Sequence, residues 1–275
     1  MLKRLCLGFL LITAAVPGLA QTTATLKSGE SNIVVTVWAA VSAPAATVLL
    51  VPGWGGGPMD VLGIGRALSA DGVAVVILTP RGWHDSQGSA TFANALDDIA
   101  AVLKWLRSSG RADLNAPDIV MGGHSWGGGM VLAYAARDSS VRRVFSIAGT
   151  DHGQFIRQYE SDPDYAARLH RVLASSAAPQ GPIRFDVDGT LRELAEGEST
   201  YGLLENANRL ADRDILLVGG WEDENVTVDR TLLPLCEALR KAGAHTLTFK
   251  VYSADHSFRT VRSQLYADLL NWVRR

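Results

Sequence analysis

The sequence has little cysteine, no apolar run long enough to span a membrane, and no excess of basic charge. Cysteine occurs at only two of its 275 positions, which excludes a small disulfide-stapled scaffold. The 26 basic and 28 acidic residues give a net charge of −2, with no basic stripe or basic amphipathic helix. The sequence therefore lacks the usual signatures of proteins that bind nucleic acids or membrane surfaces. We therefore expect a small molecule or short peptide as the partner, and the absence of internal repeats excludes a solenoid.

The start of the chain has the layout of a secretory signal peptide. A basic start precedes an apolar run at residues 5–16, and small residues at positions 18 and 20 come before Gln21. A membrane anchor needs about 20 apolar residues, so this run is too short for stable insertion. The sequence predicts a signal peptide at residues 1–20, a mature domain at residues 21–275, and export to the periplasm or extracellular space. An uncleaved anchor is the alternative.

Cleavage at that point leaves a single cysteine in the mature chain. Cys6 would be removed, so Cys236 could form no internal disulfide. Because Cys236 lies in an apolar stretch with helical spacing, we expect a buried structural thiol rather than a catalytic one.

Short apolar runs alternate with helical patterns along the mature chain. Residues 33–38 alternate with period two, as an edge strand does. The later runs, which read as strands buried on both faces, are residues 47–51, 73–78, 119–122, 144–148, 215–219 and 247–252. Helical spacing is found at residues 92–106, 130–136, 232–242 and 261–273. The pattern predicts one α/β domain, with a mostly parallel central sheet and helices on both faces.

One segment interrupts this alternation. From Gly149 to Asp214 the chain runs for about 65 residues where two to six would connect a strand to its helix. Its best helical pattern covers residues 165–173. We expect a cap insertion after the sixth strand, at about residues 150–213, and a disordered surface loop is the alternative.

The sequence Gly-His-Ser-Trp-Gly at residues 123–127 follows directly on an apolar run and precedes a helix. A serine between strand and helix needs a very sharp turn, and glycines two residues to either side let the neighbouring elements approach. The pattern predicts that Ser125 is a nucleophile in a nucleophile elbow. A phosphate-binding turn is the alternative, although the lysine of a P-loop is missing.

From about residue 47 to its end, the chain resembles the α/β-hydrolase superfamily, which includes esterases, dienelactone hydrolases and prolyl oligopeptidases. In that superfamily the chain order is nucleophile, acid, histidine. The resemblance implies that Asp223, in the turn after the strand at residues 215–218, is the acid, with Glu222 and Glu224 as rivals. It implies that His256, after the last strand, is the base.

The resemblance also implies an oxyanion hole, with the backbone N–H groups of Trp54 and Trp126 as the expected donors. A pocket is expected on a separate ground, because Trp54, Trp83, Trp126 and Trp221 each follow a different predicted strand and such strand ends converge on one crevice. At least two of these rings are expected to line an apolar pocket, and packing under the cap is the alternative. Gly53, His84 and His124 are further candidates for this pocket. The remaining histidines, at positions 152, 170 and 245, are expected on the surface.

Residues 185–191 match the opening motif of haloacid-dehalogenase-type phosphatases, in which an aspartate is the nucleophile. The proline-rich residues before it make a poor strand, so a turn within the cap is the preferred interpretation. The sequence as a whole predicts an exported serine hydrolase that cleaves a carboxylic ester or an amide through an acyl-enzyme, without metal or cofactor. A prolyl-oligopeptidase-like peptidase and a non-catalytic binding protein on the same fold are the alternatives.

Overall fold

A computed structural model of the chain describes residues 21–41, 43–115 and 117–275. Within these residues eight strands form one sheet: β1 (Gln21–Ser28), β2 (Ser31–Trp38), β3 (Thr47–Val51), β4 (Ala74–Thr79), β5 (Ile119–His124), β6 (Arg143–Ile147), β7 (Asp214–Gly220) and β8 (Leu247–Tyr252). Their order is β1-β2-β4-β3-β5-β6-β7-β8. The pairs β1–β2 and β2–β4 are antiparallel, and the other pairs are parallel. The predicted mostly parallel sheet is confirmed.

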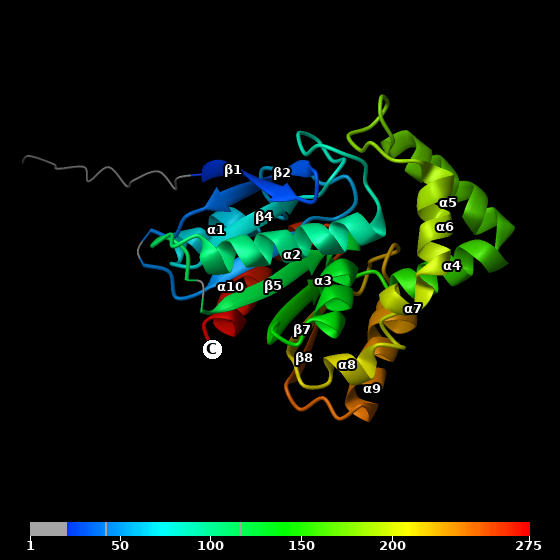
Figure 1. Ribbon diagram of the computed structural model, residues 1–275. Helices are drawn as coiled ribbons and strands as arrows, with labels where there is room; N and C mark the ends of the chain where they lie inside the picture. Colours follow the sequence, from blue (N-terminus) through cyan, green and yellow to red (C-terminus); the bar gives the residue numbers. More distant parts are fainter. Residues whose placement is uncertain (1–20, 42, 116) are drawn as a thin grey trace, which may run out of the picture.

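Helices cover both faces of this sheet (Figure 1). One face carries α2 (Phe92–Ser108) and α3 (Trp126–Arg137), and the other carries α1 (Ile64–Ala70) and α10 (Arg262–Val273). Near the far edge, η1 (Val228–Leu232) leads into α9 (Leu233–Lys241). Helices on both faces are what the alternation of apolar runs and helical patterns predicts.

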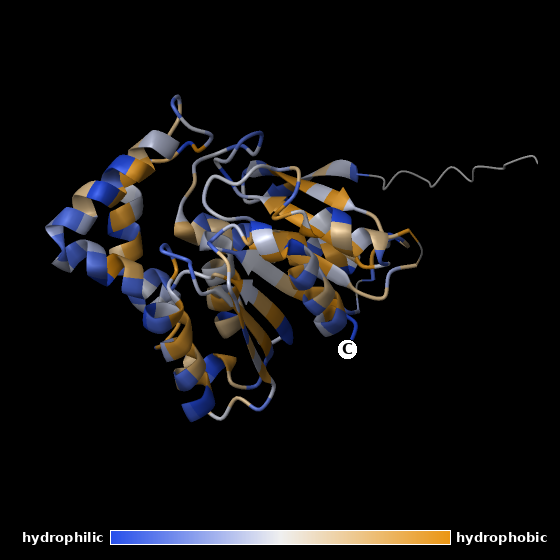
Figure 2. Cartoon of the chain, turned by 180° about the vertical axis from the view of Figure 1, so that it is seen from behind, coloured by the Kyte–Doolittle hydropathy of each residue, from blue (hydrophilic) through white to orange (hydrophobic). Residues whose placement is uncertain are grey.

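The strands bury side chains on both faces, so the molecule has two cores separated by the sheet. In β3, Leu49 and Val51 belong to the core under α2 and α3, while Val48 and Leu50 belong to the core under α1 and α10. All four side chains are fully buried. Figure 2 accordingly shows the strands as largely hydrophobic. A sheet packed in this way is a rigid platform for the loops at its ends.

Residues 149–213 fold into helices and do not form an irregular loop. The helices are α4 (His152–Ser161), α5 (Pro163–Ser176), α6 (Val187–Glu196), α7 (Glu198–Tyr201) and α8 (Ala207–Leu210). Asp151 and Asp162 accept hydrogen bonds from the first N–H groups of α4 and α5, which fixes where these helices begin. In Figure 1 the group α4–α6 stands at one side of the sheet, beyond α2 and α3. We refer to residues 149–213 as the insertion, because they include the segment expected as a cap at about 150–213; its role as a cap stays a prediction.

Two sequence-based expectations differ from the structure. Residues 33–38 do not form the edge strand, because β1 pairs with β2 along its whole length and takes the edge. Residues 185–191 are expected to form a turn within the cap, but residues 187–191 belong to α6 and Asp186 precedes its first residue. That segment therefore lacks the strand that a phosphatase nucleophile would follow.

The remaining expectations concern cysteine and the start of the chain. Cys236 lies buried in α9, as expected for a structural thiol, and burial raises its pKa. In the part of the chain that the structure describes, no helix is long and apolar enough to cross a membrane. The predicted signal peptide at residues 1–20 lies outside the described residues and stays a prediction.

Candidate active site

Ser125 lies at the junction of β5 and α3, in a backbone conformation that residues other than glycine rarely adopt. Its φ is 56° and its ψ is −122°. Such a conformation costs about 1–3 kcal/mol, so neighbouring bonds must hold it. The Ser125 N–H donates to the main-chain oxygen of Ile147 at 2.9 Å. The main-chain oxygen of Ser125 accepts from the N–H groups of Gly129 and Thr150, both at 3.1 Å. This is the sharp strand-to-helix turn that the motif predicts.

Two glycines allow the elements around Ser125 to approach one another. A Cβ on Gly123 would lie 2.3 Å from the Gly127 oxygen, and a Cβ on Gly127 would lie 2.3 Å from the Val51 oxygen. Both clashes are with backbone atoms, which can move only if β3 or α3 moves. The spacing Gly-x-Ser-x-Gly is therefore required by the packing of β5, α3 and β3.

His256 and Asp223 come together from the loops that follow β8 and β7. The His256 Nδ1 and Asp223 Oδ2 atoms are 2.7 Å apart. The Asp223 side chain is completely buried, and its second oxygen accepts the N–H groups of Asn225 at 2.8 Å and Val226 at 3.0 Å. A carboxylate held in this way binds the proton on Nδ1 of the imidazole and leaves Nε2 free to act as a base.

The neighbouring carboxylates have other partners or lie in solvent. Glu222 accepts a hydrogen bond from the Ser253 hydroxyl, and Glu224 is exposed. Asp255, which adjoins His256, accepts the N–H and hydroxyl of Ser257, and these bonds lower its pKa. Of the acidic residues considered from the sequence, Asp223 is the one whose carboxylate contacts the His256 ring.

His124 connects the turn at Ser125 to the loop of His256. Its Nε2 lies 2.9 Å from the His256 main-chain oxygen, and the two ring centroids are 4.8 Å apart. Burial, reinforced by the nearby His256, lowers the pKa of His124 to about 4. The His124 ring is therefore neutral at pH 7. Because the His256 carbonyl oxygen can only accept a hydrogen bond, the single ring proton of His124 resides on Nε2.

No hydrogen bond among the described residues joins the Ser125 hydroxyl to the His256 ring. In ligand-free sites such bonds are often long, and they tighten when a substrate binds. The attachment of the His256 loop to His124 nevertheless places that ring next to the residue that precedes Ser125.

Two unpaired backbone donors lie beside Ser125. The N–H groups of Trp54 and Trp126 donate to no residue that the structure describes. Trp126 is the first residue of α3, so the helix terminus adds positive potential there. Gly53 precedes Trp54, and a Cβ added to it would lie 3.2 Å from Ser125 Cβ, which places this turn against the serine. The arrangement suits an oxyanion that forms next to Ser125.

A cavity of about 450 Å³ opens at Ser125, and we call it the apolar chamber. Trp54 and Trp126 line it from the sheet side, and α4, α5 and α6 of the insertion supply the opposite wall. The other apolar side chains in its lining include Phe92, Phe155, Leu169, Val172, Leu173 and Leu191. A chamber with such walls suits an apolar part of a ligand.

The tryptophans predicted near the site occupy three different environments. Trp54 and Trp126 line the apolar chamber, and Trp54 Nε1 donates to the Ser176 hydroxyl of α5 at 2.9 Å. Trp83 is buried behind them, with ring centroids 5.5 Å from Trp54 and 5.0 Å from Trp126. Trp221 is 69% exposed. The described lining of the chamber does not include Trp83 or Trp221.

The other predicted pocket residues surround the site without lining the chamber. Gly53 lies against Ser125 and His124, and His84 Nε2 lies 3.0 Å from the Gly56 oxygen. Neither of them, nor His124, is among the described residues that line the chamber.

The expectation that His152 lies on the surface is wrong. Its side chain is buried in the wall of the chamber, where Nε2 donates to the Trp126 oxygen at 3.1 Å and the ring packs against Phe92. Burial lowers the pKa of His152 to about 4. The polar residues around it in sequence concealed this position, although the N-capping Asp151 before it was a signal that a helix begins there.

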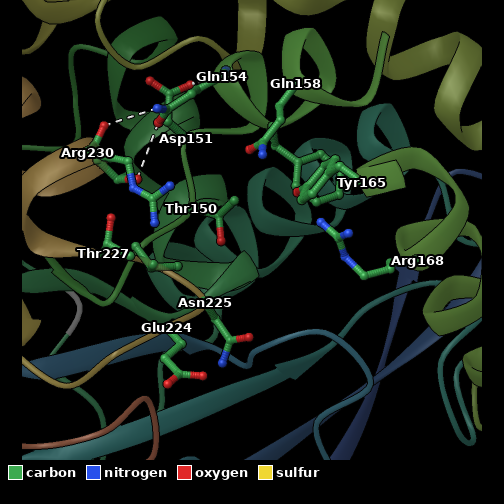
Figure 3. Close-up of a pocket in the computed structure, with 13 residues that line it drawn as sticks. Thr150, Asp151, Gln154, Gln158, Tyr165, Arg168, Glu224, Asn225, Thr227 and Arg230 are labelled. Atoms are coloured by element: carbon green, nitrogen blue, oxygen red, sulfur yellow. Dashed lines mark hydrogen bonds between the residues drawn. The ribbon is translucent and has the colours of Figure 1, made fainter. Parts of the chain in front are cut away.

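A second, polar pocket of about 270 Å³ adjoins the chamber (Figure 3). Its lining includes Gln158, Arg168, Glu224, Asn225 and Arg230, none of which the sequence singled out for binding. Among residues 21–41, 43–115 and 117–275, no cluster of three His, Cys, Asp or Glu side chains is placed to hold a metal ion.

Comparison with known proteins identifies the fold. Residues 46–176 match the family described as alpha/beta hydrolase fold. The esterase domain of a Rhodothermus marinus protein superposes with a TM-score of 0.61 at 20% identity, covering 92% of this chain and 99% of that one. A highly thermostable carboxyl esterase from Bacillus coagulans gives a TM-score of 0.70 at 15% identity, covering 92% and 97%.

The similarity extends to a peptidase. The acylaminoacyl peptidase of Pyrococcus horikoshii gives a TM-score of 0.68 at 16% identity and covers 93% of this chain, which spans 41% of that longer protein. No curated protein sequence matches the chain. The strand order, the family match over residues 46–176 and these neighbours show that the chain has the α/β-hydrolase fold.

Proposed function

We propose that the protein is a serine hydrolase that cleaves a carboxylic ester, or an amide, through an acyl-enzyme on Ser125. The observation that carries this proposal is the 2.7 Å contact between His256 Nδ1 and the buried Asp223 carboxylate, beside a serine held at φ 56°. A serine is a weak nucleophile unless a base takes its proton, and the His256–Asp223 pair is such a base.

The first half of the reaction forms the acyl-enzyme. Ser125 Oγ bonds to the substrate carbonyl carbon as its proton passes to His256 Nε2. The carbonyl oxygen becomes an oxyanion, which accepts the N–H groups of Trp54 and Trp126. The intermediate then expels the alcohol or amine, which takes the proton from His256. One such oxyanion donor contributes about 10²–10³ in rate.

The second half of the reaction releases the acid. Water gives a proton to His256 Nε2 and adds to the acyl carbon, and the same two N–H groups bind the second oxyanion. The bond to Ser125 Oγ then breaks, and His256 returns its proton to the serine. Through both halves Asp223 keeps the imidazole in one tautomer and stabilises its charged form.

The apolar chamber supports an ester with a hydrophobic acyl or aryl part. Chambers of this volume bury most of a small ligand, and aromatic walls such as Trp54 and Phe155 contribute large contact areas. Amide cleavage is the second candidate, because an acylaminoacyl peptidase is among the structural neighbours and a polar pocket adjoins the chamber.

Steady-state kinetics test this proposal. We expect the protein without residues 1–20 to hydrolyse 4-nitrophenyl hexanoate with a burst of nitrophenolate, and Ser125→Ala and His256→Ala each to lower kcat by about 10⁴-fold or more. His170→Ala, a change in the insertion outside both cavities, is the matched control. Aminoacyl 4-nitroanilides assayed in parallel separate esterase from peptidase activity. A folded protein with no turnover of either class, or full turnover by Ser125→Ala, would refute the proposal and favour a binding protein.

A further inference from the structure

The apolar chamber and the polar pocket adjoin each other and share part of their lining. Thr150, Phe155, Arg168 and Glu224 line both cavities. The Thr150 N–H also donates a hydrogen bond to the main-chain oxygen of Ser125, so the junction of the two cavities lies close to the proposed nucleophile. A substrate whose reacting carbonyl reaches Ser125 in the chamber can therefore extend into the polar pocket.

Two arginines in the polar pocket have no ion-pair or hydrogen-bond partner for their guanidinium groups among the residues that the structure describes. The guanidinium groups of Arg168, on α5, and Arg230, on η1, form no ion pair and donate no hydrogen bond to a residue that the structure describes. By contrast, Arg157 on the neighbouring α4 is paired with Glu198 and Glu205. Figure 3 shows the Arg168 and Arg230 side chains entering the pocket from opposite sides.

One contact restrains the Arg168 guanidinium, and two others hold the backbone that carries Arg230. The Arg168 guanidinium lies 5.9 Å from the centroid of the Tyr165 ring, a cation–π contact. The Gln154 side chain donates to the Arg230 main-chain oxygen at 3.0 Å and accepts from the Thr231 hydroxyl, which attaches η1 to the insertion. The two charged groups are thus presented by elements that are connected to each other.

The carboxylates near the pocket do not neutralise both arginines. The buried Asp151 carboxylate is already bonded to the N–H groups of Gln154 and Leu203, and burial raises its pKa. Glu224 is the remaining carboxylate in the lining; it is exposed and forms no ion pair with a described residue. Gln158 and Asn225 add neutral amide groups that can donate.

We propose, on the basis of the function proposed above, that the substrate carries a carboxylate, which Arg168 and Arg230 bind in the polar pocket. Its apolar part then occupies the chamber, and the scissile carbonyl lies between the two at Ser125. Guanidinium groups bind carboxylates through paired N–H donors with strong geometric selectivity. Asp151 and Glu224 are the lining carboxylates that oppose this binding, and the exposed Glu224 is the one that also lines the chamber, so it limits the affinity for the anion.

Matched ester pairs that differ only in the charge test this proposal. One pair is 4-nitrophenyl hydrogen adipate and its methyl ester, with the carboxylate in the acyl part. The other is 4-hexanoyloxybenzoate and its methyl ester, with the carboxylate in the leaving group. We expect kcat/KM to favour the anionic member of at least one pair by tenfold or more, and added salt to reduce that preference.

Variants assign the preference to the pocket. Arg168→Gln should abolish most of the preference for the anion, and Glu224→Gln should increase it. Arg171→Gln, an exposed change on the same helix that lines neither cavity, should leave it unchanged. Hydrolysis of the neutral esters without any preference for the anions, or an equal loss in the Arg168 and Arg171 variants, would overturn the proposal.

Binding measurements separate this proposal from that of the catalytic function. Calorimetric titration of Ser125→Ala with each uncleaved ester reports affinity without turnover. Tighter binding of the anionic ester that disappears in the Ser125→Ala, Arg168→Gln double variant supports the carboxylate site even if the wild type hydrolyses nothing. Equal affinity for both members of both pairs would contradict the carboxylate site, whatever the hydrolytic activity.

Discussion

His124 Nε2 donates to the main-chain oxygen of His256 at 2.9 Å, so the residue before the proposed nucleophile holds the loop that carries the proposed base. Gly53 packs against the other side of the His124 ring, where a Cβ added to Gly53 would lie 3.2 Å from His124 Nδ1. The neutral His124 ring is therefore a spacer with one donor, fixed between the turn after β3 and the loop after β8.

The first prediction concerns this donor. His124→Leu removes it and deprives the half-buried His256 main-chain oxygen of this partner, so we expect the free energy of unfolding to fall by about 1 kcal/mol. We also expect kcat for an ester to fall by about 10–100-fold because the base is displaced, with KM little changed. His124→Gln, whose amide can still donate, should recover most of kcat. Equal kcat for the leucine and glutamine variants would show that the hydrogen bond does not position His256.

The second prediction concerns the carboxylate bonded to His256. Asp223→Asn keeps the shape of the side chain but favours the wrong imidazole tautomer, so we expect kcat to fall by roughly 10³–10⁴-fold. Asp255→Asn is the matched control, because its carboxylate contacts Ser257 and not the His256 ring. Its kcat should stay within a few-fold of the wild type. A larger loss in the Asp255 variant than in the Asp223 variant would contradict the assignment.

The third prediction concerns stability at acid pH. Burial is the main cause that lowers the pKa values of His124 and His152 from 6.5 to about 4. At a pH between about 4 and 6.5, these two histidines bind protons in the unfolded chain but not in the folded protein. The stability that their neutral forms contribute is therefore fully present above about pH 6.5 and is lost as the pH falls toward 4. Each histidine should account for a loss on the order of 3 kcal/mol.

Urea unfolding at pH 7 and pH 4.5 measures this loss. His152→Gln, whose amide can still donate to the Trp126 oxygen, should make the loss smaller by about 2–3 kcal/mol. His245→Gln, on an exposed residue, should leave it unchanged. The same loss in both variants would mean that His152 does not remain neutral in the folded protein at pH 4.5.

The fourth prediction concerns the close packing around Ser125. Gly127→Ala places a methyl group 2.3 Å from the Val51 oxygen, so we expect destabilisation by about 3 kcal/mol or more, or failure to fold. Gly57→Ala is the control, because nothing lies within 4 Å of its added Cβ. Thermal unfolding of the two variants side by side measures the difference. Similar melting temperatures would show that β3 and α3 can separate at little cost.

The sequence predicted the central strands well because each is a short apolar run that ends at glycine, proline or threonine. It missed β1, whose residues are mostly polar because the strand lies at an exposed edge and pairs on one side only. It also missed α1, a helix of 7 residues with glycines at positions 63 and 65. Such short elements owe their existence to tertiary packing, which local periodicity does not report.

The positions of the candidate site residues were predictable where chain order and strand ends decide them, and less so where the direction of a side chain decides them. Ser125, Asp223 and His256 follow β5, β7 and β8, as the family order implies. Trp221 also follows a strand, but the position of its backbone does not determine which way its ring points, and the ring lies in solvent. One wall of each cavity comes from the insertion, whose packing against the sheet depends on contacts between residues far apart in sequence, such as Trp54 with Ser176.

The central claim is that Ser125 is a nucleophile activated by His256. Incubation of the folded protein with a fluorophosphonate, followed by intact-mass and peptide analysis, tests it most directly. We expect one phosphonyl adduct per chain, located on Ser125, with no adduct in Ser125→Ala and labelling at least 10³-fold slower in His256→Ala. An adduct on another residue, or labelling that is equally fast without His256, would contradict the account.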